Sequence, residues 1–324
     1  MREFGDGELM QVLKGVSRSF VLTIQALPGG LRRPVGLAYL LARASDTMAD
    51  TATAPVDARV ECLQTFAAKL TEAKAIGRLD EIRAENEAER YLLANLERVI
   101  GAVAELPAGD RKEIEELLKK ITRGQELDLV RFPDAIATRA LETAEELSEY
   151  TYLVAGCVGE FWTRICGAHL PGYGRVGVDE LCRLGRRFGQ GLQLVNILRD
   201  MPEDIAKGRC YLPMQELRAA GVSDAADLRG DLRRAAPVFE KWRGEALRCL
   251  EEGRGYIEEI RPWRVRFGCL IPWAIGVRTL KLIGERWPLE AGERVKVGRG
   301  EVARIMRRAV WGAVSNGVVR SWEE

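Results

Sequence analysis

Apolar residues recur every three to four positions along most of the chain, which is the spacing of an α-helix. The alternating, β-branched runs that mark strands do not occur, and proline and glycine gather between the periodic segments. The pattern predicts helices over about 33–50, 55–76, 80–103, 110–130, 134–169, 177–206, 224–260, 266–285 and 299–318. It therefore predicts an all-α fold.

The length of 324 residues is a weak argument for two domains, at roughly 150 residues each. The helical pattern nevertheless runs past every candidate boundary, with no low-complexity linker and no repeat of the solenoid kind. We therefore predict one all-α domain over residues 1–324, a helical bundle with a central apolar cavity.

Composition excludes several classes of protein. The formal net charge of +1 gives no electrostatic reason to expect a nucleic-acid partner. The seven cysteines are spread singly, which argues against a zinc site or a disulfide framework and suits the reducing cytoplasm. A local basic bias near the carboxy terminus is interpreted as a solvated helix face. It comprises Arg304, Arg307, Arg308 and Arg320.

No apolar stretch approaches the ~18–20 residues needed to span a bilayer, and residues 268–277 come nearest. The amino terminus lacks the order of a signal peptide. We expect a cytoplasmic protein without a transmembrane segment, which would meet a lipid substrate or product through peripheral membrane contact.

His169 is the only histidine, and it precedes Pro171-Gly172 at the end of an apolar helical run, where a structural role is expected. Histidine-based triads, zinc sites and general bases need more histidines than the chain offers. Any chemistry is therefore expected from carboxylates, metal ions and a bound cofactor.

The first candidate metal site is a pair of acids, Asp46 and Asp50, at the end of a predicted helix. Side chains at i and i+4 lie one above the other on one helix face. Two like charges at that spacing repel each other mildly, but a divalent cation that prefers oxygen ligands makes the pair favourable. The spacing therefore indicates magnesium.

The second candidate site repeats this spacing at Asp200 and Asp204. The helix face before them carries Gln193 and Asn196, surrounded by Leu192, Val195, Ile197 and Leu198, so a polar stripe is predicted to lead into a buried site. Buried carboxylates are costly unless neutralised, again by metal ions. Pro202 is expected to kink the helix between the two acids.

Two metal-loaded acidic faces opposite each other would grip the oxygens of a diphosphate. Magnesium would act as a Lewis acid on the leaving diphosphate, and apolar walls would protect the resulting carbocation from water. Arginines are expected to add bidentate contacts to the same phosphates. The candidates are Arg18, Arg43, Arg199 and Arg209.

Small residues concentrate in the apolar segment that contains Val154, Ala155, Gly156, Val158 and Gly159. Two interpretations stay open on composition alone. Small side chains let helices pack closely, although glycine costs about 1 kcal/mol in a helix interior. They also leave room for a long apolar ligand.

Taken together, these motifs resemble the squalene/phytoene synthase family over almost the whole chain. The matching segments are Ser17–Phe20 with Ile24–Leu27, Tyr39–Asp50, Tyr150–Gly159 and Gln193–Pro213. The resemblance implies an isoprenoid-synthase-like fold, a diphosphate flap containing Ser17, Arg18 and Phe20, and a first motif that includes Tyr39 and Arg43. It further implies that Val154 and Val158 line a prenyl channel and that Tyr150 acts as acid, base or cation stabiliser.

Residues 267–280 and 295–301 resemble the squalene synthase branch of the family. The resemblance implies that two farnesyl diphosphates condense through presqualene diphosphate and that NADPH reduces the product to squalene. Lys296 and Arg299 would then contact NADPH, in a non-Rossmann manner because the chain has no Gly-x-Gly-x-x-Gly motif. Asp46, Asp50, Asn196, Asp200 and Asp204 would hold Mg²⁺.

The sequence departs from the family pattern at Ala49, where many squalene synthases carry an acid, and it gives no role to Pro202 or Glu203. Three alternatives remain open. The protein makes phytoene, dehydrosqualene, presqualene diphosphate or hydroxysqualene without a reductant, or it is a terpene cyclase, or it is a non-catalytic family member that acts in assembly.

Overall fold

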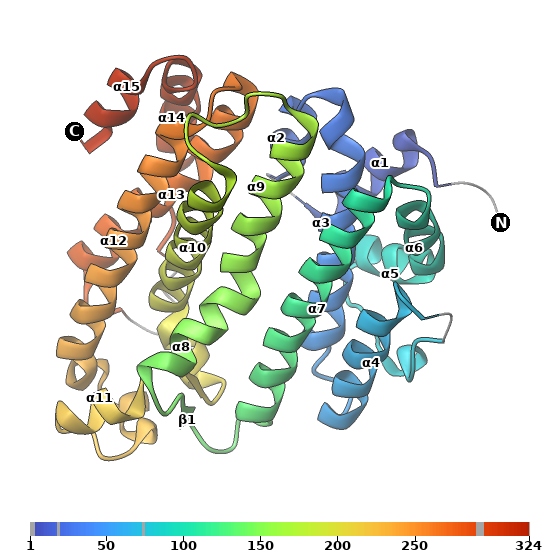
Figure 1. The fold of residues 1–324 in the computed structure, drawn as a ribbon. Helices are drawn as coiled ribbons and strands as arrows, with labels where there is room; N and C mark the ends of the chain where they lie inside the picture. Colours follow the sequence, from blue (N-terminus) through green and yellow to red (C-terminus); the bar gives the residue numbers. More distant parts are fainter. Residues whose placement is uncertain (1–3, 18–19, 73–74, 290–294, 324) are drawn as a thin grey trace. The chain divides into compact units, whose positions relative to one another are not determined.

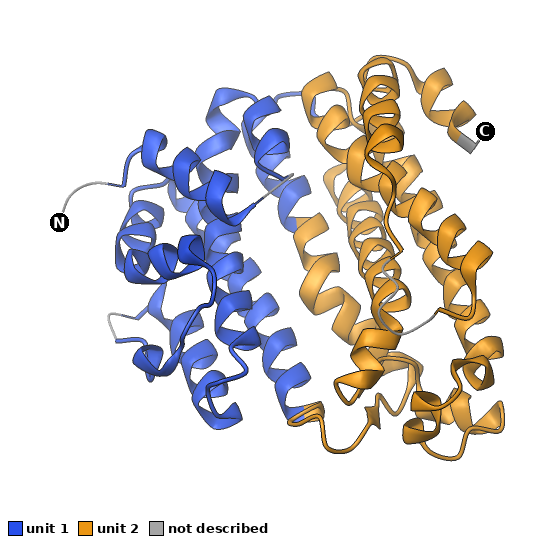
Figure 2. Ribbon diagram, turned by 180° about the vertical axis from the view of Figure 1, so that it is seen from behind, with its two compact units in different colours: residues 1–130, 161–173 blue, residues 131–160, 174–324 orange. Residues whose placement is uncertain are grey.

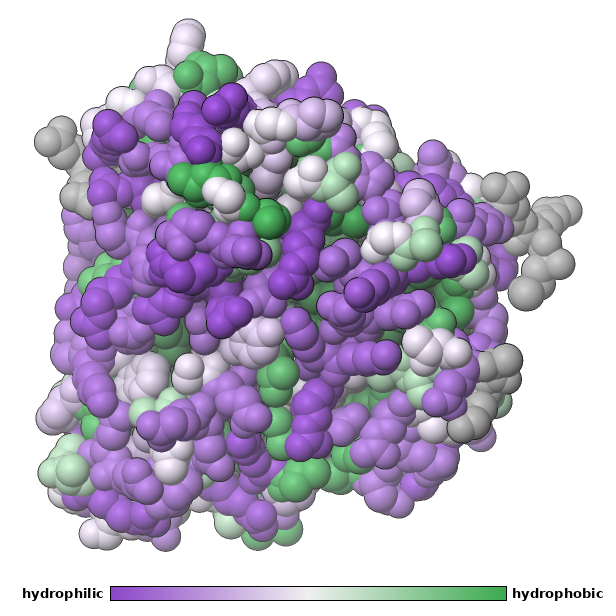
Figure 3. All heavy atoms as spheres, viewed as in Figure 1, coloured by the Kyte–Doolittle hydropathy of each residue, from purple (hydrophilic) through white to green (hydrophobic). Residues whose placement is uncertain are grey.

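The structure is a computed structural model, and it describes residues 4–17, 20–72, 75–289 and 295–323. Helices make up most of this part of the chain (Figure 1), which confirms the predicted all-α fold. The face of the molecule drawn in Figure 3 is largely hydrophilic, with smaller hydrophobic patches between charged side chains.

The chain folds into two compact units, each built from two stretches of sequence (Figure 2). Unit 1 comprises residues 1–130 and 161–173, and unit 2 comprises residues 131–160 and 174–324. The helices α7 (Ala108–Arg131) and α9 (Cys157–His169) each contribute residues to both units. The predicted single domain stays a prediction, because compactness alone does not define a folding unit.

Unit 1 is organised around one long helix, α3, which packs against α1, α4, α5 and α6. The apolar side chains of Leu37, Leu40, Leu41, Ala44 and Met48 recur at helical spacing and are buried, which explains why this segment is a core helix. Its last turn carries the first acidic pair. The elements of the unit before α7 are α1 (Asp6–Val16), α2 (Phe20–Ala26), α3 (Gly29–Asp50), α4 (Val56–Lys69), η1 (Leu79–Glu81), α5 (Glu87–Ala94) and α6 (Leu96–Ala104).

Unit 2 is organised around α10, which packs against α12, α13 and η2 and carries the second acidic motif near its end. The elements on the amino-terminal side of α10 are β1 (Arg139–Ala140), α8 (Ala144–Thr151) and the π-helical turn η2 (Tyr152–Gly156). The remaining elements are α10 (Val178–Ala206), β2 (Arg209–Cys210), α11 (Met214–Ala219), η3 (Ala225–Arg229), η4 (Leu232–Ala235), α12 (Ala236–Glu259), α13 (Trp263–Arg286), α14 (Arg299–Gly312), α15 (Asn316–Arg320) and η5 (Ser321–Glu323).

The small residues allow α10 to approach η2 and the start of α9 closely. A Cβ atom added to Gly159 would lie 1.9 Å from the carbonyl oxygen of Gly185, and one added to Gly189 would lie 2.2 Å from that of Ala155. Such distances exclude any side chain. The packing interpretation of the small residues is therefore confirmed at Gly159.

Several predicted boundaries are wrong. Helices α1, α2 and α11 were not predicted, and the predicted segment 80–103 is divided at Asn95 into α5 and α6. The segments 134–169 and 224–260 become helical only at Ala144 and Ala236, apart from short 3-10 turns before the second. The sequence also did not predict the strands β1 and β2, which pair in parallel with Arg139 opposite Arg209. Two-residue strands are too short to show a periodicity.

Helix α13 has the length and composition of a helix that could cross a membrane, with a mean hydropathy of 1.3 over its most apolar stretch. More than half of that stretch, 56%, is buried inside the protein, as in the core helix of a water-soluble protein. The expected lack of a transmembrane segment stays a prediction.

Candidate active site

The first acidic pair lies in the last turn of α3, as predicted. Asp46 keeps 47% of its side chain exposed, and Asp50 is exposed. Gln125 of α7 donates a hydrogen bond from Nε2 to Oδ1 of Asp46 over 2.7 Å. The Oε1 atom of Gln125 is buried and accepts no hydrogen bond from a described residue. The amide therefore orients one carboxylate of the pair, and its own oxygen stays available as an acceptor or ligand.

The electrostatics of this pair suit a cation. Desolvation, and then the negative charge of Asp50, raise the pKa of Asp46 to about 7. The half-exposed side chain lets water screen part of this effect. A divalent ion between the two carboxylates would remove the repulsion that raises the pKa, so the donor set fits Mg²⁺.

Arg43, predicted to bind phosphate, lies beside the pair. Its guanidinium forms an ion pair with Glu89 of α5 and a longer one, of 3.8 Å, with Oδ2 of Asp46. Glu89 was not predicted, because its contact joins residues far apart in the sequence. The acid holds Arg43 in place next to Asp46.

The predicted flap is described in part. Phe20, at the start of α2, stacks on Tyr39 of α3 with ring centroids 4.9 Å apart, and Trp162 of α9 lies 6.5 Å from Phe20. Ser17 is buried and caps the end of α1 through its backbone N–H, whereas Arg18 lies outside the described residues. The structure therefore brings Phe20 and Tyr39 together.

The second acidic pair lies in α10, which continues through Pro202 to Ala206 instead of ending there. Nε of Arg199 donates to Oδ1 of Asp200 over 2.8 Å. One turn earlier, Nδ2 of Asn196 donates to Oε1 of Gln193 over 3.4 Å. The predicted polar face is therefore present, flanked by a buried apolar face, but it is half-buried and not buried as expected. That apolar face comprises Leu194, Val195, Ile197, Leu198 and Met201.

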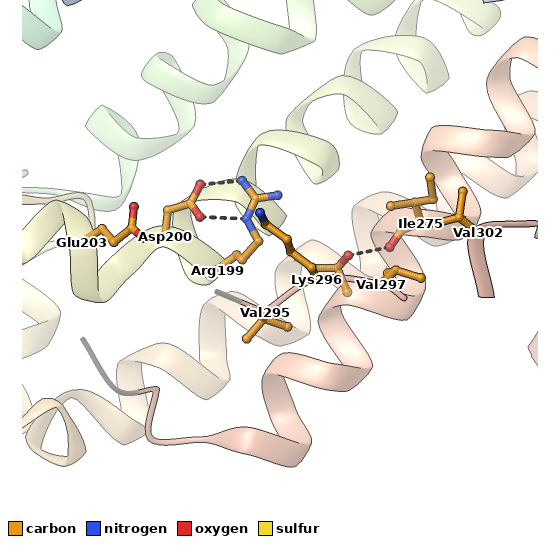
Figure 4. Close-up of a pocket in the computed structure, with 9 residues that line it drawn as sticks. Arg199, Asp200, Glu203, Ile275, Val295, Lys296, Val297 and Val302 are labelled. Carbon is orange, nitrogen blue, oxygen red and sulfur yellow. Dashed lines mark hydrogen bonds and ion pairs between the residues drawn. The ribbon is translucent and has the colours of Figure 1, made fainter. Parts of the chain in front are cut away.

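A pocket of about 480 Å³ opens beside this pair in unit 2 (Figure 4). The side chain of Lys296 extends toward the Arg199–Asp200 pair. Lys296, predicted to contact NADPH, and Arg199, predicted to bind phosphate, therefore line the same pocket. Glu203, which had no predicted role, also lines the pocket, whereas Arg299 is exposed and is not one of the lining residues. The other lining residues are Ile275, Thr279, Val295, Val297 and Val302. The pocket combines charged groups on one side with an apolar wall on the other.

Tyr150 lies in α8 and stacks on Tyr211, with centroids 4.9 Å apart and the two hydroxyl oxygens 3.5 Å apart. Phe132 contacts the other side of Tyr211 edge-on at 5.3 Å. Tyr211 comes directly after β2, which begins at Arg209. The pairing of β2 with β1 holds this segment in place within unit 2. The sequence gives no role to Tyr211, because only the fold brings the two tyrosines together.

Gly208 makes the turn into β2 possible. Its φ of +81° belongs to the left-handed region, and a Cβ atom there would lie 2.8 Å from the carbonyl oxygen of Asp134. The backbone N–H of Arg139 donates to the Gly208 carbonyl over 2.9 Å. The glycine therefore sets the path of the chain that carries Arg209.

The predicted channel residues Val154 and Val158 lie in η2 and α9, the first half-buried and the second exposed. The structure brings neither into a described pocket, so the channel stays a prediction. Within the described residues, no three His, Cys, Asp or Glu side chains gather as a metal cluster. A metal ion at either acidic pair would need further oxygen ligands, such as amide oxygens or water.

Comparison with known proteins gives one consistent family. The model of the squalene/phytoene synthase family matches residues 13–301. The squalene synthase of Schizosaccharomyces pombe is 27% identical over 307 residues, covering 93% of this chain and 64% of that protein. Squalene synthase 1 of Panax ginseng is 29% identical over 301 residues, with coverages of 91% and 68%. The chain thus spans a little less than two thirds of the fungal relative.

Solved structures support the fold. TcSQS in complex with the ligand E5700 superposes with a TM-score of 0.78 at 24% identity, covering 97% of this chain and 88% of that one. A dehydrosqualene synthase in complex with a ligand gives a TM-score of 0.66 at 19% identity, with coverages of 94% and 94%. At these identities the likeness concerns the fold alone, and it extends over nearly the entire chain.

Proposed function

The chain belongs to the squalene/phytoene synthase family, and from this premise we propose that it is a prenyltransferase that joins two molecules of farnesyl diphosphate head to head. The observation that carries the proposal is the acidic pair Asp46–Asp50 on one face of α3, where Gln125 orients Asp46 and burial with the charge of Asp50 raises the pKa of Asp46. The second pair, in α10, has an arginine already bound to Asp200.

Magnesium, when bound, supplies Lewis-acid stabilisation of the leaving diphosphate. Asp46 and Asp50 would hold it on one motif, and Asp200 and Asp204 with Asn196 on the other. Arg43, Arg199 and Arg209 would bind diphosphate oxygens, together with Arg18 and Ser17 of the flap. In this proposal Arg199 exchanges part of its contact with Asp200 for the substrate.

The carbocation left by ionisation needs an apolar surrounding and a nearby π-system. The stacked rings of Tyr150 and Tyr211 offer such a surface, and their adjacent hydroxyl groups could relay the proton that is lost when the new carbon–carbon bond forms. Phe20 and Tyr39 would cover the substrate from the flap, and Val154 and Val158 would line the prenyl chain.

We further propose that the product is squalene. NADPH, when bound, supplies the hydride for the final reduction. The pocket beside Asp200 fits a part of such a cofactor, because Lys296 and Arg199 offer positive charge to phosphates while Ile275, Val295 and Val297 offer an apolar wall. Arg299 would reach the cofactor only from outside this pocket.

The test is to incubate the purified protein with farnesyl diphosphate and Mg²⁺, with and without NADPH, and to identify products by gas chromatography and mass spectrometry. Squalene that forms only with NADPH supports the full proposal. The same product in both reactions would limit the protein to dehydrosqualene, presqualene diphosphate or a related product. No prenyl product in either reaction would remove the proposal altogether.

Asp46→Asn and Asp200→Asn test the acidic pairs directly, and each is expected to lower kcat by at least a hundredfold by removing one metal ligand. Asp179→Asn is the matched control, since Asp179 is an exposed acid in the first turn of the same helix as Asp200 and lies outside the motif. Turnover that survives both motif changes would contradict metal-assisted ionisation at these pairs.

A further inference from the structure

Large apolar side chains are exposed at one end of unit 2, close to exposed arginines. Trp311 and Val314 keep 67% and 68% of their surface exposed, and Trp263 keeps 53%. Half of the large hydrophobic residues that are exposed in the described chain lie in the segments that meet here: Val176, Val178, Trp263, Val310, Trp311 and Val314. Single exposed apolar residues are ordinary on a protein surface, but a concentration of them indicates an interaction site.

Hydrogen bonds join these segments at one end of the unit. The backbone N–H of Arg175 donates to the carbonyl of Glu259, which places the loop before α10 beside the end of α12. Arg266, one turn after Trp263, donates to the carbonyl of Gly312, the last residue of α14. The carbonyl of Ile260 accepts from both Arg175 and Arg266, so the four segments meet at this end of unit 2 although they are distant in the sequence.

Charges of both signs surround the apolar side chains, with more arginines than acids outside any ion pair of the described residues. Arg264 stacks over Trp263 with its guanidinium carbon 5.3 Å from the ring centroid. Arg307 precedes Trp311 by one turn of α14, and no described residue forms an ion pair with it. The remaining exposed arginines are Arg175, Arg261 and Arg320. Acids on the same segments include Glu258, which pairs with Arg320, Glu180, which pairs with Arg183, and Asp179 and Glu259.

We propose that this surface, the basic apolar end (Val176, Val178, Trp263, Val310, Trp311, Val314 and the five arginines), docks on an anionic lipid membrane. Tryptophan is enriched at membrane–water interfaces because its ring is apolar and its N–H is polar, and arginine is attracted to anionic headgroups. This is the composition of a surface that lies in the interface instead of crossing it.

The arrangement favours lipid over a protein partner. The six apolar side chains come from several helix ends, have charged side chains among them, and line none of the described pockets. A fluid headgroup layer can accept a mixed surface of this kind, whereas a protein interface needs a packed apolar centre.

From the sequence alone, we interpreted four carboxy-terminal arginines as a solvated helix face. Arg304 and Arg307 are indeed exposed, whereas Arg308 donates to the backbone of Ser321 and lies over Trp322. What the sequence could not show is that α14 ends beside the start of α13, which carries Trp263. The basic apolar end therefore exists only in the folded unit.

The proposal is tested by sedimenting the full chain with vesicles of phosphatidylcholine alone and of phosphatidylcholine with about 30% phosphatidylglycerol, a fraction that gives an anionic surface. We expect binding to the anionic vesicles that weakens as salt is raised. Trp311→Ser with Val314→Ser is expected to weaken binding at least tenfold, and Arg264→Gln with Arg307→Gln to abolish the preference for anionic vesicles. Sedimentation with either kind of vesicle needs no farnesyl diphosphate, so the result does not depend on the proposed reaction.

The control variant is Ile136→Ser with Arg233→Gln, which removes an exposed apolar residue and an exposed arginine from other parts of unit 2. It should bind like the unchanged protein. Equal melting temperatures would show that every variant is folded. Wild-type protein that stays in the supernatant with anionic vesicles, or that loses as much binding through the control as through Trp311→Ser with Val314→Ser, would overturn the proposal.

A second measurement separates lipid from other occupants of the surface. Brominated lipid should quench tryptophan fluorescence, and Trp263→Phe with Trp311→Phe should remove most of the quenching. If sedimentation equilibrium instead shows a dimer that Trp311→Ser dissolves, and vesicles bind neither form, the occupant is a second copy of the chain and the membrane proposal is wrong.

Discussion

Gln125 donates its amide N–H to Asp46 while its own carbonyl oxygen is buried without a partner among the described residues. Groups that orient a metal ligand usually change metal affinity by 10–100-fold when they are removed. Neither Gln125 nor Glu89 was predicted, although Asp46, Asp50 and Arg43 were. The i, i+4 spacing of the acids is a local pattern in the sequence, whereas their partners come from other helices and carry no such signal.

We expect Gln125→Leu to raise the Mg²⁺ concentration needed for half-maximal activity by about 10–100-fold, because Asp46 loses the group that orients it. The stabilisation that Mg²⁺ gives to the folded protein in thermal melts should fall in parallel. Gln64→Leu is the control, since Gln64 makes only a 3.5 Å contact with Glu126. An unchanged Mg²⁺ dependence would show that Gln125 has no part in the site.

The pKa of Asp46, raised to about 7, makes stability depend on pH in a defined direction. Below pH ~4 the carboxyl is protonated in both the folded and the unfolded chain, so it adds no pH dependence there. Between pH ~4 and 7 the unfolded chain loses this proton while the folded chain keeps it, so this group lowers the free energy of unfolding as pH rises.

In the presence of a chelator, the free energy of unfolding of Asp46→Asn should therefore rise relative to that of wild type as pH increases from ~4 to 7. Above pH ~7 the difference should stay constant. Denaturant titrations at several pH values measure this difference. Adding Mg²⁺ at pH 8 should stabilise wild type more than the variant, because only the wild type offers both carboxylates. A difference that does not change with pH would mean that the pKa of Asp46 in the folded protein is not raised.

At the scale of the elements, the long helices were predictable and the short ones were not. The observed α3, α7, α10 and α13 lie within a few residues of their predicted ranges, because each buries a long apolar stripe. Helix α11 and the strands β1 and β2 are too short to show a repeating apolar pattern, and the long-range pairing at Gly208 stabilises the strands. The same limit applies to Tyr211, whose stacking on Tyr150 depends on that pairing.

The close packing in unit 2 gives a prediction for α9. Gly159→Ala should lower the free energy of unfolding by about 1–3 kcal/mol, because the new methyl group would overlap the carbonyl oxygen of Gly185 and force the helices apart. Denaturant titration gives this value.

Gly167→Ala in the same helix is the control. The nearest side chain to its new Cβ atom would be that of Tyr173, at 4.0 Å, so the change should be neutral or stabilising by up to about 1 kcal/mol through helix propensity. Equal effects of the two variants would mean that α10 does not approach Gly159 as closely as described.

At the scale of the whole molecule, the two acidic motifs belong to different compact units, and the proposed reaction requires both to act on one substrate. If they do, Asp46→Asn and Asp200→Asn should be strongly non-additive in kcat/KM, since removing either motif already prevents ionisation. The double variant should then be about as slow as the slower single variant. Losses that multiply would show two independent sites.

The last segment of unit 1 is synthesised only after the first segment of unit 2. Its residues 161–173 include the end of α9, where Nε2 of the only histidine, His169, contacts the buried carboxylate of Asp110 at 2.9 Å. A ribosome adds roughly 5–20 residues per second, so the first 130 residues wait for some seconds before their last helix arrives. During that interval Asp110 lacks its partner His169. Cutting the gene between residues 130 and 131 would therefore not yield a free-standing amino-terminal half.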